Sequence, residues 1–304
     1  MNVHQGLDWN SPRPLVVAIG FFDGLHRGHR EIVRAALRLR RPGWRSGVLT
    51  FSNHPATHLR PASAPELLNT AEERLTLLAA AGFEECFWVR FDDAIARLPP
   101  EEFLRILVER LSVRAVVVGS TFRFGHERSD DVALMRDYLT ARDRRIVSVE
   151  HVTENGERIS STRIRALVRQ GELEAADELL GGTGYEIRGT VEIGAGRGHG
   201  LGFPTANVRP PAKLLPKDGV YSAVARYEGR DYLALLSIGD NPQFGSQRRS
   251  VEAWLRDFEQ TIYGRELAVR ALRYVREQRL FGSTGELTRQ MLRDREAIGY
   301  PTYG

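Results

Sequence analysis

The stretch of sequence that decides the fold is Gly20-Phe21-Phe22-Asp23-Gly24-Leu25-His26-Arg27-Gly28-His29. It follows an apolar run at residues 15–19 and leads into an amphipathic pattern at residues 29–39. A buried strand that ends in glycines and turns into a helix brings free backbone amides and the positive end of a helix dipole to a ligand. His26 and His29 are three residues apart, so they share one face of the first helical turn. The stretch predicts a phosphate-binding turn.

The same alternation of apolar runs and amphipathic patterns continues to about residue 150. A capping box at Thr70 and Glu73, and Pro99-Pro100, mark two helix starts. The further predicted strands are at residues 47–51, 86–91, 115–119 and 146–151, and the further helices at 71–81, 101–111 and 130–141. Strands that alternate with helices predict an α/β, Rossmann-like domain: a parallel sheet with helices on both faces and its ligands beyond the carboxyl ends of the strands.

Two later segments fall on that same edge of the predicted sheet. Residues 116–125, VVVGSTFRFG, leave the fourth predicted strand, and residues 158–165, RISSTRIR, follow the fifth and begin a helix. Hydroxyls, free amides and arginines at a helix start can bind phosphate. Taken alone, each segment is equally well interpreted as an ordinary loop with a helix cap.

The pattern changes after Leu180. The Gly-rich run at residues 181–184 is a plausible boundary, and the hydrophobic period then becomes two. The predicted strands lie at residues 185–193, 220–227, 232–238, 250–258 and 267–275. We expect a small antiparallel barrel or sandwich closed by a helix at 284–297. The predicted domains are therefore 1–183 and 184–304.

The second domain contains the Gly-rich segment GAGRGHGLGFPTAN at residues 194–207. Such a backbone can wrap phosphates with its N–H groups. Thr205 and Asn207 alternate onto one side of an extended chain and supply the oxygen ligands that Mg²⁺ prefers. Further on, the strand at 250–258 has Val251, Ala253 and Leu255 on one face. Glu252, Trp254 and Arg256 are on the other.

Composition excludes several classes of protein. The chain has 304 residues, of which 42% are hydrophobic and 27% are charged, as in ordinary globular domains. Its apolar runs are too short to span a bilayer, and its polar first residues are unlike a signal peptide. Cys86 is the only cysteine, so no internal disulfide or cysteine-based zinc site is possible. We expect a cytoplasmic protein without membrane partners.

The basic residues exclude phosphoryl-transfer sites that depend on a lysine. The formal net charge is +4 and the pI is about 9.4. The arginines are interleaved with acids, which favours an ordinary solvated surface over a nucleic-acid partner. The only lysines are Lys213 and Lys217, and neither lies in a Walker A loop or a kinase-type strand. Any phosphoryl chemistry must use backbone amides, metal, arginine or histidine.

Together, these motifs resemble the bifunctional riboflavin kinase/FAD synthetase family of prokaryotic type. The resemblance to its nucleotidyltransferase (FMN adenylyltransferase) module covers residues 14–180, and the riboflavin kinase signature covers residues 185–300. The resemblance implies that the second domain phosphorylates riboflavin to FMN. The first domain would adenylylate FMN to FAD and release pyrophosphate, with ATP and Mg²⁺ used at both sites.

The resemblance also implies roles for individual residues. His26 and His29 would stabilise charge in adenylyl transfer, and Glu252 would take the proton from the ribityl 5′-hydroxyl. The other implied ATP- or flavin-binding residues in the first domain are Gly20, Phe21, Asp23, Gly24, Gly28, Thr121, Phe122, Arg158, Ser161, Thr162 and Arg163. Those in the second domain are Gly194, Gly196, Gly198, Gly202, Pro204, Thr205, Asn207 and Tyr221, with Thr205 and Asn207 as Mg²⁺ ligands.

Two departures from the family pattern leave alternatives open. Thr121 stands where an aspartate or asparagine is usual, and residues 127–130 replace a common arginine followed by Gly-Asp. The first alternative is an enzyme with one activity, which works as a riboflavin kinase and whose first domain has weakened. A regulator that responds to RNA or flavin is the second, which the scattered arginines hardly support. We expect a monomer or a weak homo-oligomer.

Overall fold

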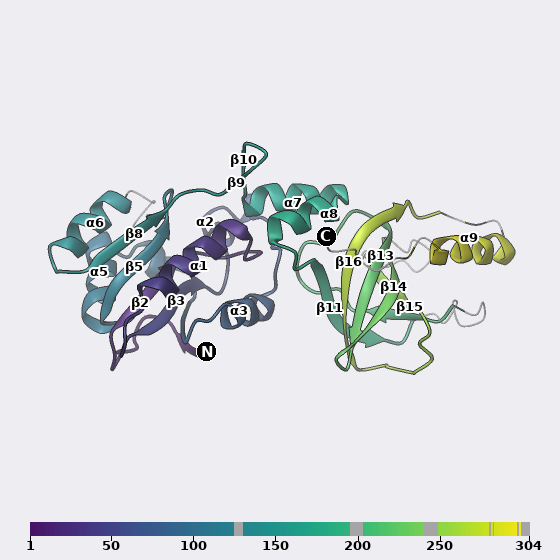
Figure 1. Ribbon diagram of the computed structural model, residues 1–304, viewed down its shortest axis with the longest axis horizontal. Helices are drawn as coiled ribbons and strands as arrows, with labels where there is room; N and C mark the ends of the chain where they lie inside the picture. Colours follow the sequence, from purple (N-terminus) through teal and green to yellow (C-terminus); the bar gives the residue numbers. More distant parts are fainter. Residues whose placement is uncertain are drawn as a thin grey trace. The chain divides into compact units, whose positions relative to one another are not determined.

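The computed structural model describes residues 1–124, 130–194, 203–239, 249–279, 281, 283–296 and 298. The chain divides into two compact units, Met1–Ser161 and Thr162–Gly304 (Figure 1). This division by contacts lies before two helices, α7 (Ser161–Gln170) and α8 (Leu173–Leu180), that the sequence analysis assigned to the first domain. Gly181 ends α8 in the left-handed conformation, with φ of 84°. The predicted domain boundary at 183/184 stays a prediction.

The first unit is built on a six-stranded sheet in the order β1-β4-β3-β2-β5-β8, and every neighbouring pair is parallel. The strands are β1 (Asn2–Gln5), β2 (Leu15–Ile19), β3 (Arg45–Phe51), β4 (Glu85–Val89), β5 (Val113–Gly119) and β8 (Arg145–Val149). From β2 the chain adds β3 and β4 on one side and then β5 and β8 on the other. The carboxyl ends of β2 and β5 therefore form the topological switch point, where such sheets bind ligands.

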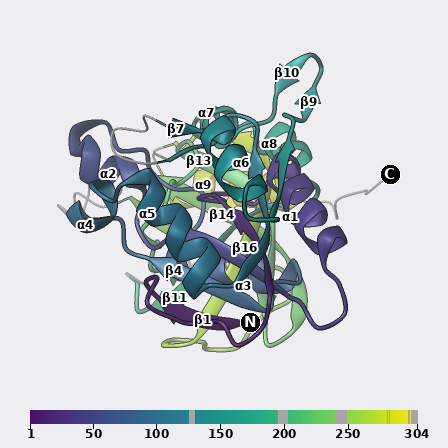
Figure 2. The ribbon, with the colours of Figure 1, turned by 90° about the vertical axis from the view of Figure 1, so that its left-hand side faces the viewer.

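Helices cover both faces of this sheet, as predicted. Helices α1 (Arg27–Leu39) and α3 (Ala71–Ala80) share one hydrophobic cluster with β2, β3 and β4. The opposite cluster contains α5 (Pro100–Arg105), its π-helical continuation Ile106–Arg110, and α6 (Val132–Thr140). Figure 2 shows α1 and α5 on opposite sides of the strands.

The shorter elements connect these layers. They are α2 (Pro55–Leu59), a 3₁₀ turn (Pro61–Ser63), α4 (Asp93–Ala96), β6 (Arg123–Phe124), β7 (Asp130–Asp131), β9 (Thr153–Glu154) and β10 (Glu157–Arg158). The capping box at the start of α3 is confirmed. Glu73 N donates to Thr70 Oγ1, and Thr70 N donates to Glu73 Oε2.

Strand β1 was not predicted, because its residues are polar. A buried carboxylate explains its position at the edge of the sheet. Glu85 on β4 has no exposed surface, and its carboxylate accepts hydrogen bonds from Asn2 Nδ2 (3.3 Å) and from the ring of His4 (2.8 Å). Arg45 on β3 donates to the same group. These polar contacts add to the backbone pairing of β1 with β4 and to the stacking of the His4 ring on Phe87.

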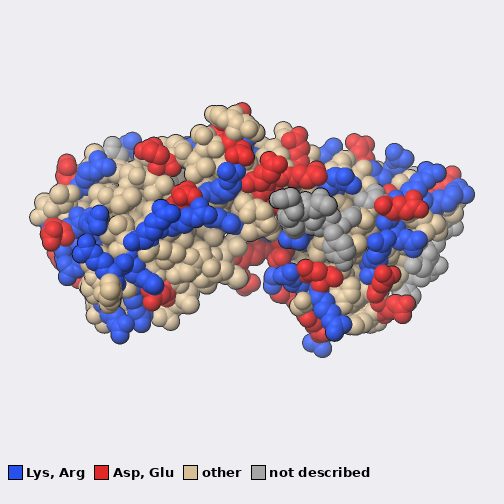
Figure 3. Space-filling model, viewed as in Figure 1, with Lys and Arg blue, Asp and Glu red and all other residues tan. Residues whose placement is uncertain are grey.

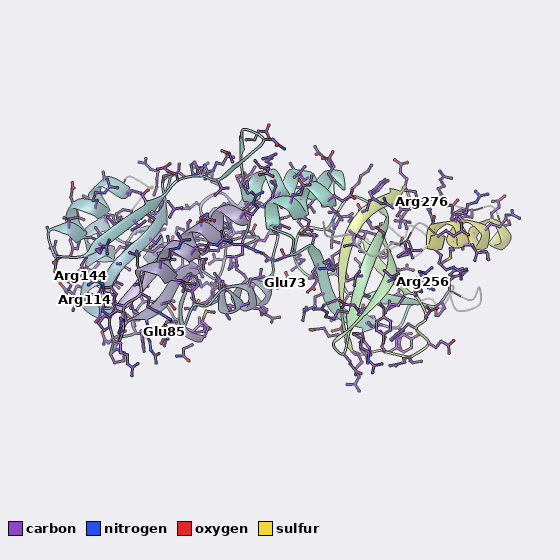
Figure 4. The ribbon with its side chains drawn as sticks, in the orientation of Figure 1. Glu73, Glu85, Arg114, Arg144, Arg256 and Arg276 are labelled. Carbon is purple, nitrogen blue, oxygen red and sulfur yellow. The ribbon has the colours of Figure 1, made fainter. Side chains whose placement is uncertain are left out.

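The second unit is a closed barrel with the strand order β11-β12-β15-β14-β13-β16 and antiparallel neighbours, so the sandwich alternative is wrong. The strands are β11 (Tyr185–Glu192), β12 (Thr205–Val208), β13 (Gly219–Tyr227), β14 (Arg230–Gly239), β15 (Ser250–Leu255) and β16 (Glu266–Arg276). Helix α9 (Thr284–Glu296) is attached to the end of β16 by a two-pronged ion pair between Arg276 and the buried Asp294. Arg276 is labelled in Figure 4. No helix within the described residues has the length and apolar character needed to cross a membrane.

Candidate active sites

The first candidate site is built on the loop that joins β2 to α1, residues 20–26, here called the β2–α1 loop. Three of its residues have left-handed backbone angles: Phe22 (φ 59°), Gly24 (φ 82°) and Leu25 (φ 37°). Glycine adopts such angles freely, but Phe22 and Leu25 do not. Both of these side chains are buried. Strained backbone of this kind persists only where the surrounding structure holds it, and it is concentrated at functional sites.

Asp23 is held from two directions. Its side chain is 2% exposed, and its carboxylate accepts hydrogen bonds from the backbone N–H groups of Leu68 (2.9 Å) and Asn69 (3.2 Å). Its backbone carbonyl accepts one from Ser161 Oγ (2.9 Å). We interpreted Asp23 as a ligand-binding residue. In the structure its carboxylate holds the loop, and Ser161, also predicted for the site, contacts the same loop through this carbonyl.

The two histidines lie together at the start of α1. His26 is the N-cap, and its Nδ1 accepts a hydrogen bond from His29 N (3.3 Å). The two rings are stacked with their centroids 3.7 Å apart. His29 Nδ1 is buried and has no hydrogen-bond partner in the described part of the chain. Burial, and then the charges of His26 and Arg158, hold the pKa of His29 well below its ordinary value. His29 is therefore neutral at neutral pH.

The second predicted segment, after β5, is joined to the third, before α7. Arg158 on β10 donates to Thr121 Oγ1 at 3.4 Å. Since Ser161 of the third segment also binds the carbonyl of Asp23, the three predicted segments meet at the switch point. Phe122 is half-buried beside Phe124. Gly20 and Phe21 begin the β2–α1 loop, and Gly28 lies in the first turn of α1. Thr162 and Arg163 follow Ser161 in α7, where the second unit begins.

A hollow of about 540 Å³ was not predicted. It lies beyond the carboxyl ends of β3 and β4, on the same edge as the switch point. It is lined by Asn53, Thr57, His58, Arg90, Phe91, Asp92, Asp93 and Ala94. Asn53 fixes its wall by exchanging two hydrogen bonds with the backbone of Phe91, at 2.8 and 2.9 Å. The sequence contains an indication of this hollow, because polar residues follow both predicted strands at the edge of the sheet where ligands bind.

Basic side chains form a band across the first unit over helix α1 (Figure 3). Within this helix, Arg27, Arg30, Arg34 and Arg38 are spaced by three or four residues and so share one face. Arg27 pairs with Glu154 and Arg34 with Glu31. The sequence-based description of the arginines as scattered misses this band, although the ion pairs confirm the interleaving with acids.

The second candidate site lies on neighbouring strands of the barrel. Asn207 on β12 and Ser237 on β14 are the register partners of Glu252 on either side of β15. Thr205 Oγ1 lies 3.5 Å from Glu252 Oε2. Thr205 and Asn207 thus share the side of β12 that was predicted. Gly194 contacts the Asn207 amide so closely that a Cβ there would lie 2.0 Å from Asn207 Nδ2. A larger residue at position 194 would therefore displace the Asn207 side chain.

Other residues predicted for this site lie elsewhere or are not described. Tyr221 has no exposed surface and donates its hydroxyl to the backbone carbonyl of Lys217, and its predicted role in binding stays a prediction. Trp254 shares the face of Glu252 but is buried beside Phe203, 5.7 Å away. Pro204 is exposed. Gly196, Gly198 and Gly202 lie outside the described residues.

Comparison with known proteins agrees with this division. The FAD synthetase family matches residues 9–163, and the riboflavin kinase family matches residues 181–299. The bifunctional riboflavin kinase/FMN adenylyltransferase of Bacillus subtilis is 34% identical over 292 residues, which cover 94% of this chain and 92% of the relative. The chain belongs to this bifunctional family.

Two further comparisons also extend over most of the chain. The Escherichia coli K12 protein of the same name is 34% identical over 285 residues, which cover 92% of this chain and 90% of its own. A crystal structure from Streptococcus pneumoniae, named a macrolide-efflux protein, superposes with a TM-score of 0.90 and 30% identity, and covers 98% of this chain and 99% of that one. The chain therefore shares its fold with that structure over nearly its whole length.

Proposed function

We propose that this bifunctional enzyme adenylylates FMN to FAD at the β2–α1 loop and phosphorylates riboflavin to FMN beside Glu252. The observation that carries the proposal is the separation of the two clusters. The stacked histidines with Asp23, Thr121, Arg158 and Ser161 are in the first compact unit, and the row formed by Asn207, Glu252 and Ser237 is in the second.

In the adenylylation step, an oxygen of the FMN phosphate attacks the α-phosphorus of ATP. The bond between the α-phosphorus and the bridging oxygen breaks, and pyrophosphate leaves. No enzyme nucleophile is needed, so catalysis consists of positioning and of charge stabilisation. The amides at the start of α1, His29 and Arg158 provide donors and positive potential for the phosphates. A neutral His29 can gain a proton when phosphate oxygens approach it, because that charge then has a partner.

In the kinase step, the 5′-hydroxyl of riboflavin attacks the γ-phosphorus of ATP, and ADP leaves. The hydroxyl proton passes to the Glu252 carboxylate, which acts as general base. Glu252 is half-buried between strands whose register is fixed on both sides. A base held in this way needs little reorganisation when the hydroxyl is bound.

We further propose that Mg²⁺ accompanies ATP at the kinase site. No group of three or more His, Cys, Asp or Glu side chains within the described residues could hold a metal ion. The oxygens of Thr205, Asn207 and Glu252 lie together and are of the hard type that Mg²⁺ binds alongside substrate phosphates. Thr205 and Asn207 would hold the ion, which would neutralise charge on the phosphates.

The Thr121 departure is the feature that favours the one-activity alternative, but it leaves one contact in place. Threonine still binds Arg158 through its hydroxyl, so the junction between the second and third segments of the first unit is intact. Three expectations stay predictions: a cytoplasmic location, a monomer or weak homo-oligomer, and no nucleic-acid partner.

The test is a chromatographic time course with purified protein, riboflavin, ATP and Mg²⁺. FMN and ADP should form first, followed by FAD and pyrophosphate. Formation of FMN without FAD, even when FMN is supplied, would contradict the adenylylation half of the proposal. FAD formation from supplied FMN without any turnover of riboflavin would contradict the kinase half.

A further inference from the structure

The β2–α1 loop is held by a segment that lies about 45 residues further along the chain and contains no residue assigned above to either reaction. This segment, residues 68–74, is here called the brace. Asn69 forms a reciprocal pair with the loop: its backbone N–H donates to the Asp23 carboxylate (3.2 Å), and its Oδ1 accepts from Gly24 N (2.8 Å). Leu68 N adds a second bond to Asp23. The bonds fix the two residues at the centre of the strained turn.

The brace is itself rigid where it contacts the loop. It runs into α3, whose first turn is closed by the Thr70–Glu73 capping box. Figure 4 labels Glu73 at the start of this helix. A capped first turn resists fraying, so Asn69 and Arg74 lie at fixed positions on either side of the box.

Arg74 extends the brace beneath the loop. Its side chain is 1% exposed, and its guanidinium lies 4.0 Å from the ring centroid of Phe21 and 4.7 Å from that of Trp88. Its Nη2 donates to the Phe51 carbonyl at 2.6 Å. One side chain thus connects Phe21, in the loop after β2, with the backbone at the end of β3.

Arg74 is costly for the fold. Its Nε and Nη1 are buried and have no hydrogen-bond partner in the described part of the chain. Burial lowers its pKa to about 10, against the attraction of Asp23. A buried group left partly unpaired destabilises a protein, and an apolar side chain of similar volume is often neutral or stabilising in its place. Stability alone therefore does not explain an arginine at this position.

We propose that Asn69 and Arg74 are positioning residues for adenylyl transfer, which hold the β2–α1 loop so that the amides and histidines of α1 face the phosphates of ATP. The inference rests on the proposed function of that loop. Misplacement of catalytic groups by about 1 Å can cost roughly 10²-fold in rate, even when the change lies away from the reacting atoms.

The experiment uses the full-length variants Arg74→Met and Asn69→Ala. Met fills most of the volume of Arg and removes the unpartnered N–H groups but cannot bind Phe51. Ser46→Ala is the matched control: Ser46 is fully buried at the opposite, amino-terminal end of β3, where its Oγ donates to Gly82 O. FAD formation is measured as kcat and KM for ATP. Riboflavin phosphorylation by the same molecules and Tm are recorded alongside.

Both brace variants should lose about 10- to 100-fold in kcat for FAD formation, with smaller changes in KM. Riboflavin phosphorylation should stay within twofold. The Tm of Arg74→Met should change by less than about 4 °C, which corresponds to roughly 1 kcal/mol in a domain of this size. Ser46→Ala should lower Tm and leave kcat unchanged.

Brace variants with kcat within twofold of wild type, or with losses no greater than that of Ser46→Ala, would overturn the inference. If Arg74→Met fails to fold, Asn69→Ala decides alone. A separate variant, His29→Ala, distinguishes a failure of the brace inference from a failure of the function proposed for the loop. If His29→Ala loses FAD formation and the brace variants do not, only the brace is wrong. If His29→Ala also keeps its activity, the function proposed for the loop is wrong.

Discussion

The two active sites differ in how far apart their residues lie in the sequence and in what holds them together. In the first unit, Asp23 is bound by Leu68 and Ser161, which are 45 and 138 residues further along the chain. In the second, Asn207, Glu252 and Ser237 are direct neighbours across three strands. A site on paired strands takes its geometry from the register of the barrel. A site on loops needs separate contacts for each loop, and single side chains such as Asn69 supply them.

The largest effect should come from the strand-built site. Glu252→Gln keeps the shape of the side chain but removes the proton acceptor, so riboflavin phosphorylation should fall by about 10²- to 10⁴-fold. ATP and riboflavin binding should change much less. FAD formation from supplied FMN should survive, because that chemistry belongs to the other unit. A variant with the wild-type Tm and phosphorylation rate would remove Glu252 from the mechanism.

The contrast between the sites also explains what the sequence could predict. Alternation predicted that Thr205 and Asn207 share one side of β12 and that Glu252 lies on the face of β15 opposite Val251, because a period of two fixes which side chains share a face. The stretch from Gly20 to His29 predicted a phosphate-binding turn after a central strand for a similarly local reason.

The remaining features depend on contacts that no local pattern encodes. Asn69 and Arg74 follow no motif beyond an ordinary capping box, and their partners are tens of residues away. Strand β1 has no apolar periodicity that would reveal it, since its side chains Asn2 and His4 bind the buried carboxylate of Glu85. The full burial of Tyr221, with its hydroxyl on the carbonyl of Lys217, is likewise not visible in the sequence, and its predicted role in binding stays a prediction.

In the loop-built site, His29→Ala should lower FAD formation by about 10²-fold, the usual loss for one transition-state donor. FMN formation should remain within twofold, since His29 lies in the unit without Glu252. Initial rates from supplied FMN and from riboflavin separate the two effects. Equal loss of both activities in a folded variant would show that the two sites are not independent.

The independence of the kinase unit can be tested with two fragments, residues 162–304 and residues 184–304. Both contain all the kinase residues and should phosphorylate riboflavin without forming FAD. The longer fragment keeps α7 and α8, where Val168 O accepts from Lys217 N (3.3 Å) and Leu173 and Leu179 are buried. The shorter one should therefore melt more than about 4 °C lower. Equal Tm values would show that these helices do not support the barrel. Absence of kinase activity in a folded fragment would contradict the autonomy of this unit.

The smallest effect concerns pH. The pKa of His29 is lowered in the folded state, so below about pH 6.5 the unfolded chain takes up a proton that the folded chain does not. The contribution of neutral His29 to the free energy of unfolding is therefore fully present above that pH. It is lost as the pH falls, by at most about 1.4 kcal/mol per pH unit. His29→Gln should flatten the decline in Tm between pH 7.5 and 5.5. Identical slopes for variant and wild type would contradict the lowered pKa.

The most direct test of two separate sites is a mixing experiment with Glu252→Gln and His29→Ala. Given riboflavin, ATP and Mg²⁺, Glu252→Gln alone should form almost no FMN and therefore no FAD. His29→Ala alone should form FMN and nearly stop there. The mixture should form FAD at a rate close to that of wild type, because FMN released by one variant is adenylylated by the other. A mixture that forms no more FAD than His29→Ala alone, although Glu252→Gln still converts supplied FMN, would contradict the account.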